Sequence, residues 1–235
     1  MDKKMIQDYL DTQNLALSTL DIQVIIAALH TVMNVSTEKQ AETLKLSLPI
    51  NEQNNSFDHG DINHSVFDLL MQFDQQQALL VNICAVLDSA QAQYGQDYLT
   101  LYVFPENQAD VDVEEQQKPT STLVNLINLY QHHPSKIQES HQVIKEVEQV
   151  GQSGWAMVVE DIKKWQSLHN DVVFDDLMGS CLCLPIHTAH GVIVGVLLAQ
   201  QQAINGFSQE HQATLVALVL VLQSLLKQLN WRTIH

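Results

Sequence analysis

The residues of this chain that most readily suggest chemistry are its 11 histidines, because neutral imidazole is the commonest protein ligand for metals. Four of them form two groups that could suggest a metal site. His59 and His64 lie in the Asp-containing stretch 58–64, and His187 and His190 lie on either side of an expected turn. A zinc site needs three or four ligands that converge from fixed elements, and neither group supplies them on regular structure. We therefore interpret these histidines as solvent-exposed loop residues and expect no metal site.

Three cysteines could act as nucleophiles, namely Cys84, Cys181 and Cys183. Their odd number and irregular spacing do not fit a disulfide framework. A reactive thiol needs a pKa lowered by a nearby cation or helix N-terminus, and neither adjoins Cys183 in the sequence. We expect Cys181 and Cys183 to point to opposite faces of one strand and not to bond each other. Since no Gly-x-Ser-x-Gly motif or similar arrangement is present either, we expect no enzymatic activity.

Trp155, Asp161 and Trp165 surround the end of an expected strand and the loop after it. A carboxylate beside aromatic rings is the kind of polar point that orients a ligand in an apolar pocket. An Asp at a strand end also commonly caps the following turn through its side chain, so both interpretations of Asp161 stay open. Together with Cys183, whose strand could border a pocket, these three residues form the candidate ligand site.

Charge and hydropathy limit the classes of partner. The chain has 235 residues, with 27 acidic against 11 basic side chains and a net charge of -16. Such a chain repels the phosphates of nucleic acids and anionic lipid surfaces. The N-terminus lacks the apolar segment of a secretory signal, and the longest apolar run, 215–222, is far below the roughly 20 residues of a membrane span. We expect a cytoplasmic protein that binds neither nucleic acid nor membrane.

The first quarter of the chain has helical periodicity. Ser18 and Asp21 form a capping signal before apolar residues at helical spacing through Met33. A second helix is expected at 37–46. It contains two lysines and two glutamates, and it therefore lacks the basic surface that DNA binding needs. Residues 49–64 are polar and lack an apolar period. We therefore predict a helical extension at 1–48, a linker at 49–64 and the main domain at 65–235.

Helices and strands follow one another in the main domain. We expect a helix over 65–93, a strand over 98–104 and a weaker strand near 111–113. A helix from Ser121, stopped at His132-His133-Pro134, should follow. We then expect a helix over 143–150 with a strand as the alternative, a strand over 155–162, and a polar loop over 163–171. The stretch 175–226 then indicates strand, tight turn, strand, loop and long helix.

Four features occur in a characteristic order. They are the acidic strand end Glu160-Asp161, the strand 179–186 that contains Pro185, the Gly-containing strand 191–197, and the helix start Phe207-Ser208. In this order they resemble the C-terminal half of a GAF domain, a small sensory fold. The resemblance implies an α+β fold with an antiparallel sheet flanked by helices. It also implies a regulatory module that binds a small molecule, with no particular cofactor indicated.

The functional motifs of that family match less well. Where cyclic-nucleotide-binding members carry Asn-Lys and Asp-Glu pairs, this chain has Gln201-Gln202 and His211-Gln212, which leaves Phe207 of the set. No Cys is followed by His, as bilin attachment requires, and 163–178 lacks the cysteines of members that reduce methionine sulfoxide. The resemblance therefore favours a non-catalytic sensory or regulatory module that signals through a partner protein or through dimer geometry. The alternative is a ligand-free scaffold for protein–protein interaction.

The last expected helix is apolar nearly all round, over 215–229. Such a helix needs a second surface to bury it, supplied by helices of the same chain or of a twin. Domains of the resembling family often dimerise through terminal helices, and on this basis we predict a homodimer.

Overall fold

The structure is a computed structural model that describes residues 2–35, 74–95, 98–104, 124–130, 145–169, 178–188 and 190–229. Its centre is an antiparallel sheet of five strands in the order β2-β1-β5-β4-β3. The strands are β1 (Tyr98–Val103), β2 (Val124–Tyr130), β3 (Met157–Val159), β4 (Ser180–His187) and β5 (Ile193–Gln201). The predicted α+β class, with an antiparallel sheet flanked by helices, is confirmed.

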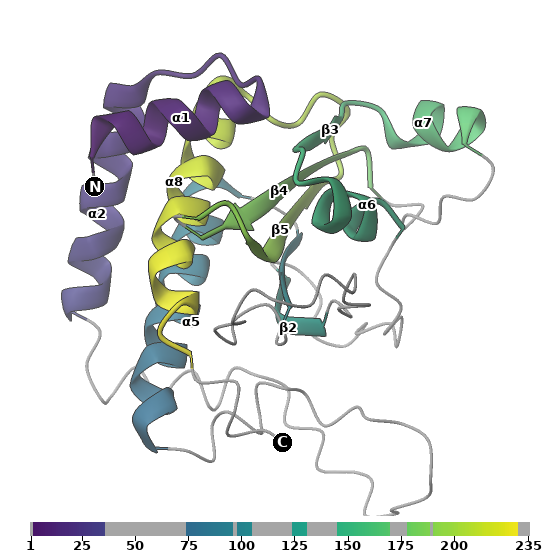
Figure 1. The fold of residues 1–235 in the computed structure, drawn as a ribbon. Helices are drawn as coiled ribbons and strands as arrows, with labels where there is room; N and C mark the ends of the chain where they lie inside the picture. The colour runs from purple at the N-terminus through teal and green to yellow at the C-terminus, as the bar shows by residue number, and fades with distance from the viewer. Residues whose placement is uncertain are drawn as a thin grey trace, which may run out of the picture.

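Helices α5 (Asp74–Tyr94) and α8 (Gln209–Leu226) pack on one face of this sheet, and α1 (Lys3–Gln13) and α2 (Thr19–Val35) lie on the same side, α2 against α5 and α8. Figure 1 shows α2, α5 and α8 running side by side, with α1 across their upper end. Their apolar side chains and those of Leu99, Leu182 and Leu197 from the sheet form one continuous core. The two N-terminal helices therefore belong to the same core as the sheet.

Helix α8 lies at the centre of this helical layer. Ser208 caps it by accepting a hydrogen bond from the backbone N–H of His211 at 3.3 Å, as the sequence indicated. Every residue from Ala213 to Leu222 is buried. The surfaces that cover this apolar helix belong to α2, α5 and β4 of the same chain. The surface that we expected to bury this apolar helix therefore belongs to the same chain.

The other face of the sheet is covered by α6 (Lys145–Ser153), with α7 (Ile162–Leu168) following β3. Figure 1 shows α6 in front of the sheet and α7 at its far edge, away from α1 and α2. The buried residues on this face form a second apolar group, which we call the α6-side cluster. Its members are Tyr102, Phe104, Val147, Val150, Val159, Ile162, Met178, Cys181, Cys183, Val196 and Leu198.

Two predictions of secondary structure are wrong. Residues Val124–Tyr130 form strand β2 and not a helix, because they pair antiparallel with β1, Leu99 lying opposite Leu129. This pairing overrides the helical spacing of the apolar residues. The predicted loop at 163–171 contains helix α7, which begins after the N-cap residue Asp161.

Other predicted elements are confirmed with altered bounds. The segment predicted at 143–150 as a helix or a strand is a helix, α6. Strand β3 is shorter than the predicted strand 155–162. Among the described residues, α5 begins at Asp74. The predicted linker at 49–64, the helix at 37–46 and the strand near 111–113 lie outside the described residues, so the proposed domain boundaries stay predictions. Among the helices that the structure describes, none is long and apolar enough to cross a membrane.

Candidate functional site

A buried carboxyl group is the most unusual feature of the α6-side cluster. Glu146 lies in the first turn of α6, and its side chain is 3% exposed. A carboxylate there is favoured by the helix dipole. Its Oε2 atom, however, is buried and has no hydrogen-bond partner. Buried polar atoms in native proteins nearly always have a partner, so this oxygen requires an explanation.

The sequence gave no reason to single out Glu146. Val147 and Val150 are apolar and buried, and Glu146 has the same residue type as the exposed Glu148 on the same helix. In an amphipathic helix such charged residues normally form the solvated face. The burial of Glu146 arises because α6 packs on β4 and β5, and that packing is visible only in three dimensions.

Trp165 supplies a second buried polar atom without a partner. Its side chain packs against the α6-side cluster from α7, and its Nε1 donor has no acceptor. Its ring stacks on His169 with centroids 4.2 Å apart. Of the four predicted site residues, Cys183 belongs to the α6-side cluster and Trp165 packs against it.

Cys181 and Cys183 point to the same face of β4, and the prediction of opposite faces is wrong. Residues two apart on a strand share a face, because side chains alternate with a period of two. Both side chains are fully buried in the α6-side cluster, and both are free thiols. The pKa of Cys183 is raised well above its usual value, first by the hydrogen bond with Cys181, then by burial, and also by the negative charge of Glu146. Glu146 and Cys183 are therefore neighbours.

The other two predicted site residues have different surroundings. Asp161 is the N-cap of α7, and its Oδ1 accepts a hydrogen bond from the Lys164 backbone N–H at 3.0 Å. This is the capping role that the sequence left open beside ligand contact. Trp155 lies in the connection between α6 and β3, and its side chain is 60% exposed.

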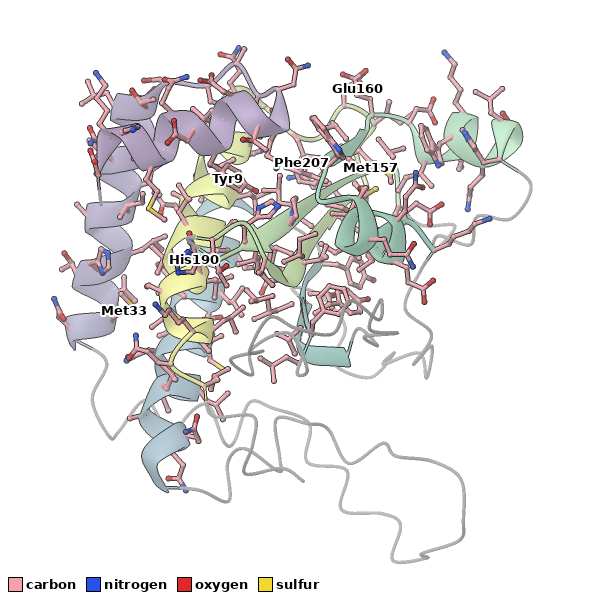
Figure 2. The ribbon with its side chains drawn as sticks, in the orientation of Figure 1. Tyr9, Met33, Met157, Glu160, His190 and Phe207 are labelled. Atoms are coloured by element: carbon pink, nitrogen blue, oxygen red, sulfur yellow. The ribbon has the colours of Figure 1, made fainter. Side chains whose placement is uncertain are left out.

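Helix α1 holds the edge of the sheet beside this connection. Tyr9 reaches from the underside of α1 toward β4, where its hydroxyl donates to the Pro185 carbonyl oxygen at 3.0 Å (Figure 2). The buried amide of Gln13 donates to the Gly154 carbonyl oxygen at 3.1 Å and accepts from the Ala156 N–H. The ring of His187 packs edge-on against Tyr9, and its burial lowers the pKa of its imidazole. The N-terminal helix therefore fixes the chain that leads from α6 into β3.

No group of three or more metal-ligating side chains occurs within the described ranges. His190 is exposed, while His59 and His64 lie outside those ranges. A shallow hollow of about 180 Å³ does occur, lined by Gln23, Ile26, Ala27 and His30 of α2. It lies on the helical side of the sheet and not at Glu146.

No protein-family model matches this sequence, and no curated protein matches it. Solved structures do resemble it. The GAF domain of a phosphoenolpyruvate-protein phosphotransferase from Acinetobacter is 14% identical with a TM-score of 0.46, covering 68% of this chain and 88% of its own. The corresponding GAF domain from Coxiella burnetii is 16% identical with a TM-score of 0.42. The match covers 87% of this chain and 92% of the Coxiella chain. A type II free methionine-R-sulfoxide reductase from Thermoplasma acidophilum is 13% identical with a TM-score of 0.47. The match covers 68% of this chain and 96% of the reductase chain.

The expected resemblance to GAF domains is thus found among solved structures, as a likeness of fold.

Proposed function

We propose that this protein is a non-catalytic sensory or regulatory module that binds a small molecule on the α6-covered face of its sheet. The observation that carries the proposal is the buried Oε2 atom of Glu146, which has no partner. Leaving a buried polar group without a hydrogen bond is costly, and the cost is greater for a charged group. A protein accepts that cost where a ligand satisfies the group in the bound state.

Two further features support this site. Trp165 packs against the α6-side cluster and offers an unpartnered donor on the same side of the sheet. Gln13 ties α1 to the backbone at Gly154 and Ala156, directly after α6. A ligand that shifts α6 would therefore act on α1, and α1 would pass the change to a partner protein or to a second subunit.

Native mass spectrometry tests the proposal. The purified wild-type protein should carry a non-covalent adduct that is absent from the denatured mass. The adduct should be lost in Glu146→Gln, which keeps the shape of the side chain, and kept in Glu148→Gln, which alters an exposed residue of the same helix. An adduct of equal occupancy in both variants would rule out a role for Glu146. A wild-type protein that carries no adduct and is not stabilised thermally by any compound of a metabolite library would count against ligand binding altogether.

The second candidate function is a scaffold for protein–protein interaction, and exposed apolar residues on α2 favour it. Leu20 and Val24 are 66% and 63% exposed and lie one turn apart. Since α8 is covered within the chain, a homodimer has to use another surface, and we propose this stripe of α2. Sedimentation velocity at micromolar concentration should give a dimer that Leu20→Asp converts to monomer. The control is Leu168→Asp, at a similarly exposed leucine on α7. A monomeric wild-type protein would exclude the dimer.

A further inference from the structure

The residues around Glu146 indicate what kind of molecule its carboxyl group accepts. The Oε2 atom of Glu146 is buried and receives no hydrogen bond. A buried carboxylate is stabilised most strongly by a cationic N–H donor, because charge-assisted hydrogen bonds are about twice as strong as neutral ones. Among the described residues no such donor is bonded to Oε2, which leaves this position to a cationic group of a ligand.

The sheet beneath α6 provides polar and aromatic neighbours for such a cation. Leu198 of β5 lies opposite Cys183 of β4 on one side and opposite Thr100 of β1 on the other. This row crosses two strand spacings, about 10 Å, which suits a small metabolite. Thr100 is buried, and on the same strand face Tyr98 and Tyr102 stand two positions to either side of it.

Aromatic rings on this face reinforce the preference for a cation. Tyr98, Tyr102, Phe104 and Trp165 all belong to the α6-side cluster or pack against it. The faces of aromatic rings attract ammonium and guanidinium groups, and sites for quaternary ammonium ligands use such rings. The net charge of -16 acts in the same direction, since it raises the local concentration of cations and lowers that of anions.

We propose that the ligand of the α6-side cluster is a small organic cation, with a protonated amine or guanidinium on Glu146 and a hydrogen-bond acceptor on the Nε1 donor of Trp165. This inference rests on the proposed function and adds the charge class of the ligand. Anionic ligands such as nucleotides and sugar phosphates are disfavoured, because they would bring a second negative charge to a buried carboxylate.

Simple probes of similar size test the charge class. We would titrate the protein with n-butylammonium, methylguanidinium, n-butyrate and 1-butanol, and follow the indole N–H resonances in ¹⁵N–¹H spectra. The Trp165 signal is assigned with a Trp165→Phe variant. We expect saturable shifts of the Trp165 signal with the two cations, at least tenfold weaker effects with butyrate and butanol, and at least tenfold weaker cation binding in Glu146→Gln. Glu148→Gln should bind as the wild-type protein does.

The outcomes separate this inference from the proposed function. If Glu146→Gln binds the cations as well as wild type, or if butyrate binds best, the cation inference fails. A co-purified adduct that needs Glu146 but is neutral or anionic by its mass would also overturn the cation inference, while it would support the proposed site. If Glu146→Gln does not fold, as judged by circular dichroism, the comparison of cation with butanol on the wild-type protein decides the question.

Discussion

Gln13 and Gly154 are joined by a hydrogen bond, from the side-chain Nε2 of one to the backbone carbonyl oxygen of the other, across 141 residues of sequence. The same amide accepts from the Ala156 N–H through its oxygen. A single buried side chain of α1 thus satisfies two backbone groups at the turn between α6 and β3. Gly154 has a φ of 72°, in the left-handed region that favours glycine, so the shape of this turn depends on both residues.

The first prediction concerns the stability that this amide provides. Gln13→Ala should lower the free energy of unfolding by about 1–3 kcal/mol, because it leaves two backbone groups without a partner. The measurement is urea denaturation followed by circular dichroism. Gln7→Ala is the matched control, because Gln7 lies on the same helix and its exposed side chain donates a hydrogen bond to Asp11. This substitution should change the free energy of unfolding by no more than about 0.5 kcal/mol. Equal losses in both variants would contradict the role of Gln13.

The second prediction is a dependence of stability on pH. Burial lowers the pKa of His187 below its ordinary 6.5, although the hydrogen bond with the Gly154 backbone opposes the shift. The unfolded chain therefore binds a proton more readily than the folded protein. The contribution of neutral His187 is present above pH 6.5 and is lost as the pH falls through the lowered folded-state pKa.

Urea midpoints measured between neutral and mildly acidic pH should thus decrease with falling pH in the wild-type protein. His187→Gln should make this decrease smaller, while His190→Gln, at an exposed residue of the same turn, should leave it unchanged. An unchanged slope in His187→Gln would show that other groups control the acid response.

How far the sequence predicts this fold depends on how local each signal is. Ser208 and the apolar run after it define α8 without further information, because the cap and the burial both belong to that helix. Strand β2 could not be predicted in this way, since its pairing partner β1 lies more than 20 residues earlier in the chain. Helix α7 was missed because Ile162 is its one buried residue, so it has no apolar period to recognise.

The candidate site follows the same division. Trp165 and Cys183 could be named from the sequence, because they adjoin strands that border the covered face of the sheet. Glu146 could not, since a glutamate in the first turn of a helix is normally an exposed residue that complements the helix dipole. Its burial follows from the packing of α6 on β4 and β5.

The third prediction concerns the thiols. Burial raises the pKa of Cys84 to about 12, with a further contribution from Asp88, and the pKa of Cys183 is raised by its hydrogen bond with Cys181. Since the thiolate is the nucleophile, iodoacetamide at mildly alkaline pH should modify none of the 3 cysteines in the native protein. Intact mass spectrometry should then find all of them alkylated in urea. Rapid native modification at Cys183 would mean that this thiol is reactive and would reopen the question of catalysis.

The fourth prediction separates the two interpretations of Asp161. If Asp161 acts as an N-cap, Asp161→Ala should lower the free energy of unfolding by about 1 kcal/mol. Asp161→Asn should lower it little, because Asn caps equally well. Both values come from urea denaturation. If Asp161 also contacts a ligand through its charge, Asp161→Asn should lose the native adduct without losing stability. Retention of the adduct in Asp161→Asn would assign the residue to capping alone.

The central position of α8 has a consequence for synthesis of the protein. This helix lies between α2 and α5 and against β4, yet it comes after all of them in the chain, and β1 likewise pairs with the late strand β5. While the ribosome makes the first 200 or so residues, the apolar faces of α2 and α5 have no completed core to join. The nascent chain therefore exposes these surfaces until α8 emerges, and we expect chaperones that bind apolar segments to engage it during that interval.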